Sequence, residues 1–424
     1  MPKKKSGHNK GRVENGLDPL ESASVASVAS EESDAPTSLS NDFEDLAGVQ
    51  SIVDRINAAS EALMEKRLET RVKALNFLIN CFRMHYLYLD ESWNYSATLL
   101  GGIEYVLKKG RTQDQALAVD CLTVFFLQFI SQNIQDYFAR FWPILDTALR
   151  DTTVSTLLRA ACATALSIFQ LVAGQCDFVS SKELMKSFES VFKGSCLKGD
   201  GKAPVLDAHV SSLHVTTLRA WGILYTFLAS YDVGPVGKAM LPTLISLLQG
   251  ANVDLRITAG EVAVLIYERI RIEEDKRFRG PYYCELTRLL NGLSTDGTKS
   301  RSKIERRKQR HTFRELVDAL EHSEVTETSI NFGSECLQLG SCTEHMHYDL
   351  LCCLLKGGLS RHLQENSLVR DLFDLGPPVV LPTNPLDRRS ARDQRRLANA
   401  LASKLRTQKL SSHRDRRNVL AEID

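Results

Sequence analysis

Residues 153–172 read TVSTLLRAACATALSIFQLV, and this stretch decides the fold class. Its apolar residues recur every three or four positions, which places them on one face of a helix. They are Val154, Leu157, Leu158, Ala161, Ala165, Ile168, Phe169 and Val172. Residues 255–270 repeat the spacing, and no comparably long stretch alternates with the period of two that a half-buried strand requires. The sequence therefore predicts an all-α fold.

A repeat becomes visible when the helical segments are aligned. Similar places near the start of long helices are occupied by Arg71, Gln115, Arg159, Arg219 and Arg256. Successive members are separated by 44, 44, 60 and 37 residues, and most of these separations lie near the roughly 40 to 47 residues of armadillo and HEAT units. The separation of 60 residues is longer because it contains the loop 198–204. The pattern predicts an armadillo/HEAT-like helical solenoid whose concave side is an extended docking surface.

Two details of each repeat follow from residue type. Pro143 and Pro242 are predicted in the first turn of the shorter helix, where a missing N–H costs little. The repeat arginines are expected to cap helices or to bridge neighbouring repeats, and contact with acidic ligands is the alternative.

Composition divides the chain into three parts. Residues 1–45 are rich in serine and acidic residues and are predicted to form a disordered tail, because they offer little apolar surface. Residues 46–375 are the predicted armadillo-like domain. Residues 376–424 are predicted to form a proline-containing linker and a basic C-terminal helix.

The formal net charge of +1 over 424 residues conceals a segregation of charge. No lysine or arginine lies between Arg12 and Arg55, where ten acidic residues stand. Residues 299–314 hold eight basic residues against one acid, and residues 386–424 hold eleven against five. This distribution indicates a polyanionic partner.

Several classes of protein are disfavoured. The longest apolar run, Leu122–Ile130, is about half the roughly 20 residues of a bilayer helix, and the basic N-terminus lacks the apolar stretch of a secretory signal. The ten cysteines are mostly well separated, which is typical of reduced, buried thiols. We therefore expect a cytoplasmic and nuclear protein without a membrane span.

No residue set for catalysis is visible, so no enzyme activity, cofactor or small-molecule substrate is expected. Gly199-Asp200-Gly201-Lys202-Ala203 lacks the hydroxyl and the first glycine of a phosphate loop. The best zinc candidates are Cys336, Cys342, His345 and His347, but their spacing does not form the usual short knuckle. We expect these cysteines to be small buried residues and no metal to bind.

The basic segment 299–314 is a stronger signal. On a helix, Lys303, Arg306, Arg307 and Arg310 would share one side, while Ile304 and Phe313 would anchor it to the solenoid. A solvated helix and a nuclear import signal are the alternatives. The predicted RNA contacts in this segment are Lys303, Arg306, Arg307, Lys308, Arg310 and Arg314.

The C-terminal segment carries a second set of cations. Leu397, Leu401 and Leu405 recur every four residues and predict a helix with one narrow apolar stripe. Aromatic stacking residues are absent from it, so recognition of RNA backbone and shape is expected, with a solubilising tail as the alternative. The predicted RNA contacts are Arg388, Arg389, Arg392, Arg395, Arg396, Lys404, Arg406, Lys409, Arg414, Arg416 and Arg417.

Several motifs together resemble the interferon-related developmental regulator family. They are Leu255–Glu261, Leu293–Gly297, Arg307–Arg310 with Phe313-Arg314, Thr326–Thr328 with Phe332-Gly333, and Leu375–Val379. The resemblance implies an armadillo-like domain followed by a distinct C-terminal region. It carries the family's basic motif onto Arg307, Lys308 and Arg310, and its basic ending onto Arg406 and residues 414–417. Residues 409–412 are less basic than in the family.

The resemblance also implies two functions, neither of them catalytic. Members are linked to translationally inactive ribosomes, where the C-terminal helix enters the channel between the subunits. This implies a protein that binds ribosomal RNA and ribosomal proteins and represses translation by occlusion. Members are separately linked to transcriptional co-regulation, so the alternative is a nuclear scaffold that binds co-repressor peptides in the solenoid groove.

Overall fold

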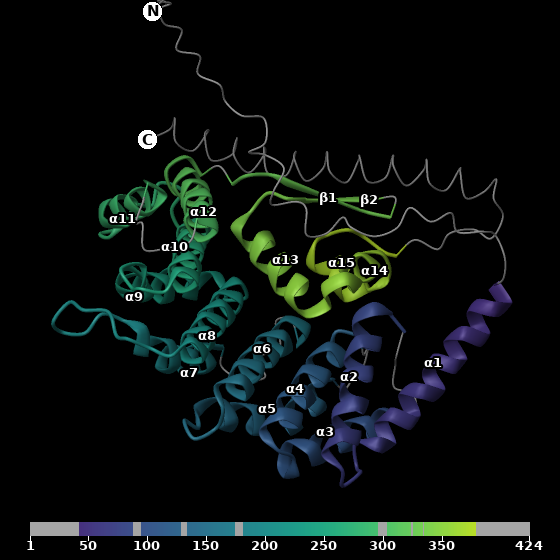
Figure 1. Ribbon diagram of the computed structural model, residues 1–424. Coiled ribbons are helices and arrows are strands. Elements are labelled where there is room, and N and C mark those ends of the chain that lie inside the picture. The colour runs from purple at the N-terminus through teal and green to yellow at the C-terminus, as the bar shows by residue number, and fades with distance from the viewer. Residues whose placement is uncertain are drawn as a thin grey trace, which may run out of the picture. The chain divides into compact units, whose positions relative to one another are not determined.

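A computed structural model describes residues 42–87, 95–128, 134–173, 181–295, 303–323, 325–333 and 335–378. Contacts divide the chain at residue 49, so α1 (Asp42–Ala62) begins in a first unit and ends in the second, to which all that follows belongs. The described residues are almost entirely helical, and the predicted all-α helical solenoid is confirmed (Figure 1). None of the described helices has the length and apolar character needed to cross a bilayer.

Helices alternate between two layers. The inner layer consists of parallel helices that pack one against the next: α2 (Leu68–Met84), α4 (Thr112–Phe126), α6 (Thr156–Ala173), α8 (Ala208–Thr226), α10 (Val253–Glu273) and α12 (Lys303–His322). Each of the last five is covered by the helix that precedes it: α3 (Ser96–Lys109), α5 (Ile134–Arg150), α7 (Ser181–Phe192), α9 (Ser230–Leu248) and α11 (Tyr283–Thr295). The short 3-10 turn η1 (Lys193–Ser195) follows α7.

The inner helices are buried on more than one face. In α10, the six consecutive residues Val262–Tyr267 are all buried. Consecutive residues of a helix point in different directions, so α10 must be covered on every side along this stretch. Helices α8 and α12 flank it and α9 lies on the outer side. A further element is therefore needed on the remaining side.

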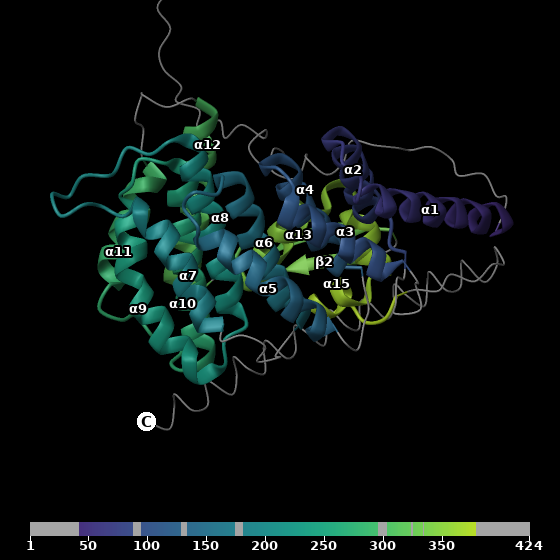
Figure 2. The same ribbon diagram turned by 90° about the horizontal axis from the view of Figure 1, so that it is seen from below.

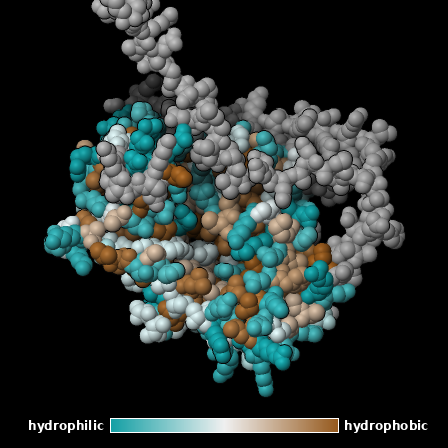
Figure 3. Space-filling view, viewed as in Figure 1, coloured by the Kyte–Doolittle hydropathy of each residue, from teal (hydrophilic) through white to brown (hydrophobic). Residues whose placement is uncertain are grey.

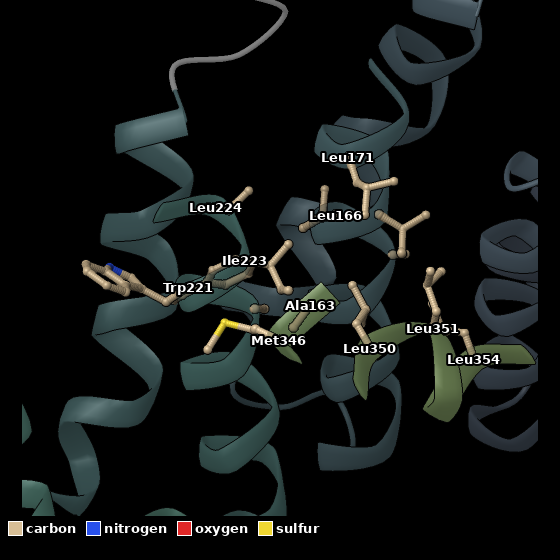
Figure 4. Packing of buried hydrophobic residues seen from close by; sticks show 14 of the residues in the cluster. Ala163, Leu166, Leu171, Trp221, Ile223, Leu224, Met346, Leu350, Leu351 and Leu354 are labelled. Atoms are coloured by element: carbon tan, nitrogen blue, oxygen red, sulfur yellow. The ribbon is translucent and has the colours of Figure 1, made fainter. Parts of the chain in front are cut away.

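The elements between residues 328 and 372 supply that cover. A hairpin of β1 (Thr328–Phe332) and β2 (Glu335–Leu339) leads into α13 (Cys342–Leu355), η2 (Lys356–Gly358), α14 (Leu359–Glu365) and α15 (Ser367–Leu372). Seen from below, α5 lies in front and α13 and α15 lie behind it (Figure 2). Met346, Leu350, Leu351 and Leu354 of α13 join the buried cluster of α6 and α8 (Figure 4).

Hydrogen bonds fix α13 at both ends. The Glu268 carboxylate accepts the backbone N–H groups of Cys342 and Thr343 at 2.9 and 3.3 Å, so a carboxylate lies at the positive end of the helix. Arg83 of α2 donates from Nε to the Leu354 carbonyl at 2.7 Å, next to the last residue of α13. The sequence predicts an extended docking surface on the inner side of the solenoid. Over α2, α8 and α10 that side is instead covered by α13–α15 of the same chain.

Two local predictions are wrong. Pro143 and Pro242 lie inside α5 and α9, not in their first turns. Both prolines are exposed, on helices of the outer layer, where water can bond the carbonyl that each leaves without an N–H partner. Arg219 is the twelfth residue of α8, whereas the other repeat residues are each fourth in their helices, and Ser211 takes that place in α8.

Candidate nucleic-acid interface

The basic segment forms a helix with one buried and one exposed side, but of the predicted basic side Arg306 and Arg310 are half-buried and, among the side chains described, only Arg307 is exposed. In α12, Gln309, Phe313, Leu316 and Leu320 are buried and recur every three or four residues. They face α10 and α11. On the opposite side Arg307, Lys308, His311 and Arg314 are exposed. In Figure 3 hydrophilic and hydrophobic residues are interspersed over the visible face of the body.

Only one of the two predicted anchors contacts the solenoid. Phe313 is fully buried, which confirms its part, but Ile304 is 81% exposed. Nine residues separate them, which at about 100° per residue puts them half a turn apart. The second anchor is instead Gln309, whose Oε1 accepts Arg256 Nη2 at 2.6 Å and whose amide donates to the Leu293 carbonyl at 3.2 Å.

The predicted RNA contacts of α12 divide into two groups. Arg307, Lys308 and Arg314 are exposed, and Lys308 Nζ lies 3.4 Å from Asp254 Oδ1 in an ion pair open to solvent. Arg306 and Arg310 are half-buried. Within the described ranges, the buried Nε of Arg306 donates to no acceptor. Lys303 is the first residue of α12, and its side chain is not among those that the structure describes.

Three of the four repeat arginines bridge helices, as expected: Arg71, Arg159 and Arg256. Arg71 and Asp114, at the starts of α2 and α4, form a buried pair in which Nε lies 2.8 Å from the carboxylate. Arg159 donates to the Leu149 carbonyl of α5 at 2.9 Å. These contacts place the guanidinium groups inside the stack, where they hold neighbouring helices together.

The four zinc candidates are not brought together. His347 is buried against Thr226, with 2.8 Å between Nε2 and Oγ1, and burial lowers its pKa to about 4. His345 bonds the Ser341 carbonyl. Cys342 is packed beside Glu268, where burial raises the pKa of its thiol. Cys336 is exposed on β2, so the prediction of a buried residue is wrong for this cysteine. No group of three metal-ligating side chains occurs among the described residues.

The basic residues of the C-terminal segment, Arg388 to Arg417, lie outside the described residues. The structure does describe where that segment leaves the body. Arg370 of α15 is fully buried and donates to the carbonyls of Leu363, Leu375 and Gly376 at 2.7, 3.0 and 2.7 Å. It also bonds the Glu335 carboxylate at 2.9 Å. We call this set of contacts the Arg370 clamp.

Sequence reasoning missed the Arg370 clamp. Arg370 stands in the same helical phase as Leu363 and Phe373, both buried, which is the signal that could have shown it to face inward. A buried arginine needs several acceptors, and the carbonyls at the end of α14 and after α15 supply them. The clamp ties the start of the C-terminal segment to β2 and α14.

The fold and the site define an all-α repeat protein with a cationic helix at one end of its inner layer. A family model described as interferon-related developmental regulator matches residues 22–321, and one described as interferon-related protein conserved region matches residues 366–418. Mouse interferon-related developmental regulator 2 is 32% identical, with 91% of this chain and 89% of the relative covered. Human and pig interferon-related developmental regulator 1 are each 30% identical, and each match covers 87% of this chain and 82% of the relative. The chain belongs to the interferon-related developmental regulator family.

Proposed function

We propose that this protein is a non-enzymatic ribosome-binding protein that represses translation or marks inactive ribosomes. The observation that carries the proposal is the cationic face of α12, where Arg307, Lys308 and Arg314 are exposed while the opposite face is anchored in the solenoid. Ribosomal RNA offers dense phosphate, so several such contacts add and orient the body.

The C-terminal segment would supply the repression. Its cations begin at Arg388, twelve residues after Gly376, whose carbonyl the Arg370 clamp holds, so the segment starts from a fixed point on the body. From that origin a basic helix would occupy the path of mRNA and tRNA by occlusion. This requires no catalytic group, cofactor or small-molecule substrate. The proposed location is the cytoplasm, where translating ribosomes are found, with a nuclear pool.

The alternative, a nuclear scaffold that binds co-repressor peptides in the groove, is less well supported. Over α2, α8 and α10 the inner side of the solenoid packs against α13. A peptide could lie there only if α13 moved away, which would expose Met346 and Leu351 and break the hydrogen bonds to Glu268.

Co-sedimentation with purified 80S ribosomes over a range of salt concentrations tests the proposal. We expect the full chain to bind, and both the R307Q/K308Q/R314Q variant and a chain lacking residues 386–424 to bind at least tenfold more weakly at moderate salt. The matched control K186Q/K276Q/R277Q removes three exposed cations elsewhere and should bind like the wild type. Full-length protein that ignores ribosomes at low salt, or partners that persist after RNase treatment, would refute the proposal.

A further inference from the structure

Two turns at the far end of the inner layer from α12 carry exposed cations. The turn between α1 and α2 has Lys66 and Arg67, and the turn between α3 and α4 has Lys109 and Arg111. All four side chains are exposed, and none forms an ion pair with another residue that the structure describes. We call these four residues the twin-turn patch.

A buried ion pair holds the two turns side by side. From Nη1, Arg71 donates to the carbonyls of Glu65 and Lys66 at 2.9 and 3.0 Å, which fixes the first turn. The same guanidinium bonds Asp114, whose other carboxylate oxygen accepts the backbone N–H of Arg111 at 2.5 Å and fixes the second. The spacing of the patch is therefore set by groups inside the stack.

Helix stability does not explain cations at these positions. Arg67 and Arg111 are the N-cap residues of α2 and α4. A helix N-terminus carries partial positive charge and favours Ser, Thr, Asp or Asn at the cap, whereas a guanidinium has no acceptor for the first N–H groups. Lys109 lies in the last turn of α3, where a cation is favourable, but Arg67 and Arg111 work against their own helices. A helix N-terminus next to a cationic side chain does, however, favour the binding of an anion.

The patch lies on the same edge of the layer as the start of α12. The inner helices are parallel, and neighbouring starts are in contact: Arg71 of α2 bonds Asp114 of α4, and Lys308 of α12 pairs with Asp254 of α10. Between them, α4, α6, α8 and α10 pack one against the next. At 8 to 10 Å per packed helix, α4 and α12 are roughly 30 to 40 Å apart.

We propose that the twin-turn patch binds backbone phosphates of the same RNA that meets the cationic face of α12. The inference rests on the proposed function and extends its footprint along the edge of the solenoid. A duplex carries one phosphate charge per about 1.7 Å of axis, so a folded RNA presents phosphates to both sites at once. Contact is to the backbone because the patch has no aromatic side chain to stack on bases.

The test uses the full chain and purified 80S ribosomes. The variant R67S/R111S removes two patch cations and places a good N-cap residue at both positions. Binding should weaken about five- to tenfold at moderate salt, and the slope of log affinity against log salt should fall by about 0.7 to 0.9 for each phosphate that is no longer neutralised. The melting temperature should stay the same or rise. The control K276S/R277S removes two exposed cations from the opposite edge, between α10 and α11, and should bind like the wild type.

The outcomes separate this inference from the proposed function. Weaker binding by R67S/R111S with an unchanged or raised melting temperature supports the patch. If R307Q/K308Q/R314Q loses binding and R67S/R111S does not, the proposed function stands and the patch is refuted. Equal losses in R67S/R111S and K276S/R277S also refute it, because binding would then follow total charge. If the wild-type chain ignores ribosomes, both proposals fail.

Discussion

Arg370 and Glu335 form an ion pair of 2.9 Å in which the side chains are 0% and 2% exposed. The pair joins α15 to β2. Its guanidinium also bonds three carbonyls at the end of α14 and after α15. One side chain thus organises the last part of the body before the C-terminal segment begins.

Breaking this pair should be costly. E335Q removes the counter-charge of the buried guanidinium, and R370M removes the donor that Glu335 and the three carbonyls share. Each change is expected to lower the free energy of unfolding by about 3 to 5 kcal/mol, measured by urea denaturation. K202Q, which breaks an ion pair open to solvent at 4.0 Å from Asp200, should change it by less than about 0.5 kcal/mol. A loss below about 1 kcal/mol in both buried variants would contradict the clamp.

Two adjacent glycines should respond differently to alanine. A Cβ on Gly358 would overlap the Arg83 carbonyl oxygen of α2, whereas one on Gly357 would have only Met84 Sδ nearby, at 4.0 Å. G358A must therefore push η2 away from α2 and loosen α13 and α14. We expect faster hydrogen exchange of the α13 and α14 amides in G358A and little change in G357A. Equal exchange in the two variants would show that η2 does not need this close approach.

The docking of α13 should depend on pH through His347. Burial, followed by the charge of Arg269, lowers the pKa of His347 to about 4, below its ordinary 6.5. The unfolded chain therefore binds a proton between pH 6.5 and 4 that the folded chain does not. Stability from this group is present above pH 6.5 and decreases as the pH falls, by about 2 kcal/mol between pH 7 and 5.

H347Q cannot bind that proton, so its free energy of unfolding should fall less than that of the wild type over the same range. Glu268 and Asp349 act in the opposite direction, because burial raises the pKa of each carboxyl in the folded state. They are common to both proteins and cancel in the comparison. Denaturant titrations at pH 7 and pH 5 measure the difference, and identical pH dependence would exclude this role for His347.

The negative charge of Asp254 in the wild-type chain should oppose RNA binding by the cationic face of α12. Its carboxylate lies 3.4 Å from Lys308 Nζ, and both side chains are largely exposed. D254N removes a negative charge from the proposed interface and should tighten ribosome binding about two- to fivefold at low salt. D232N, at a half-buried acid paired with Lys182 away from α12, is the control. Tighter binding by both variants would mean that net charge alone is responsible.

Periodicity was sufficient to predict the layers but not what covers them. The spacing of residues 153–172 predicts a helix packed along one side, whereas in α6 the seven consecutive residues 165–171 are all buried and Leu157 is exposed. The hairpin was missed because β2 shows only a five-residue alternation of buried and exposed positions, too short to stand out. The covering position of α13 depends on contacts such as that between Arg83 and Leu354, which are 271 residues apart. The periodicity of a short stretch of sequence carries no information about such distant contacts.

The site was predicted in part for the same reason. Charge density identified α12, and helical phase correctly placed Phe313 inward, but phase also shows that Ile304 could not share its face. The Arg370 clamp and the two fixed turns depend on side chains that bond carbonyls of other elements. From composition alone, such arginines would be taken for surface charges. In the structure Arg370 and Arg71 are buried, and they fix the positions of the segments that carry the exposed charges.

Stacks of repeats usually melt by fraying, because each unit touches only its immediate neighbours and stability is a sum of local terms. Here the stretch from Ser341 to Leu372 touches α2 near one end and α8 and α10 toward the other. Detaching any one of these helices therefore disturbs contacts made several units away. The domain should lose its structure in a single concerted transition, and truncation from either end should cost more than the removed pair alone.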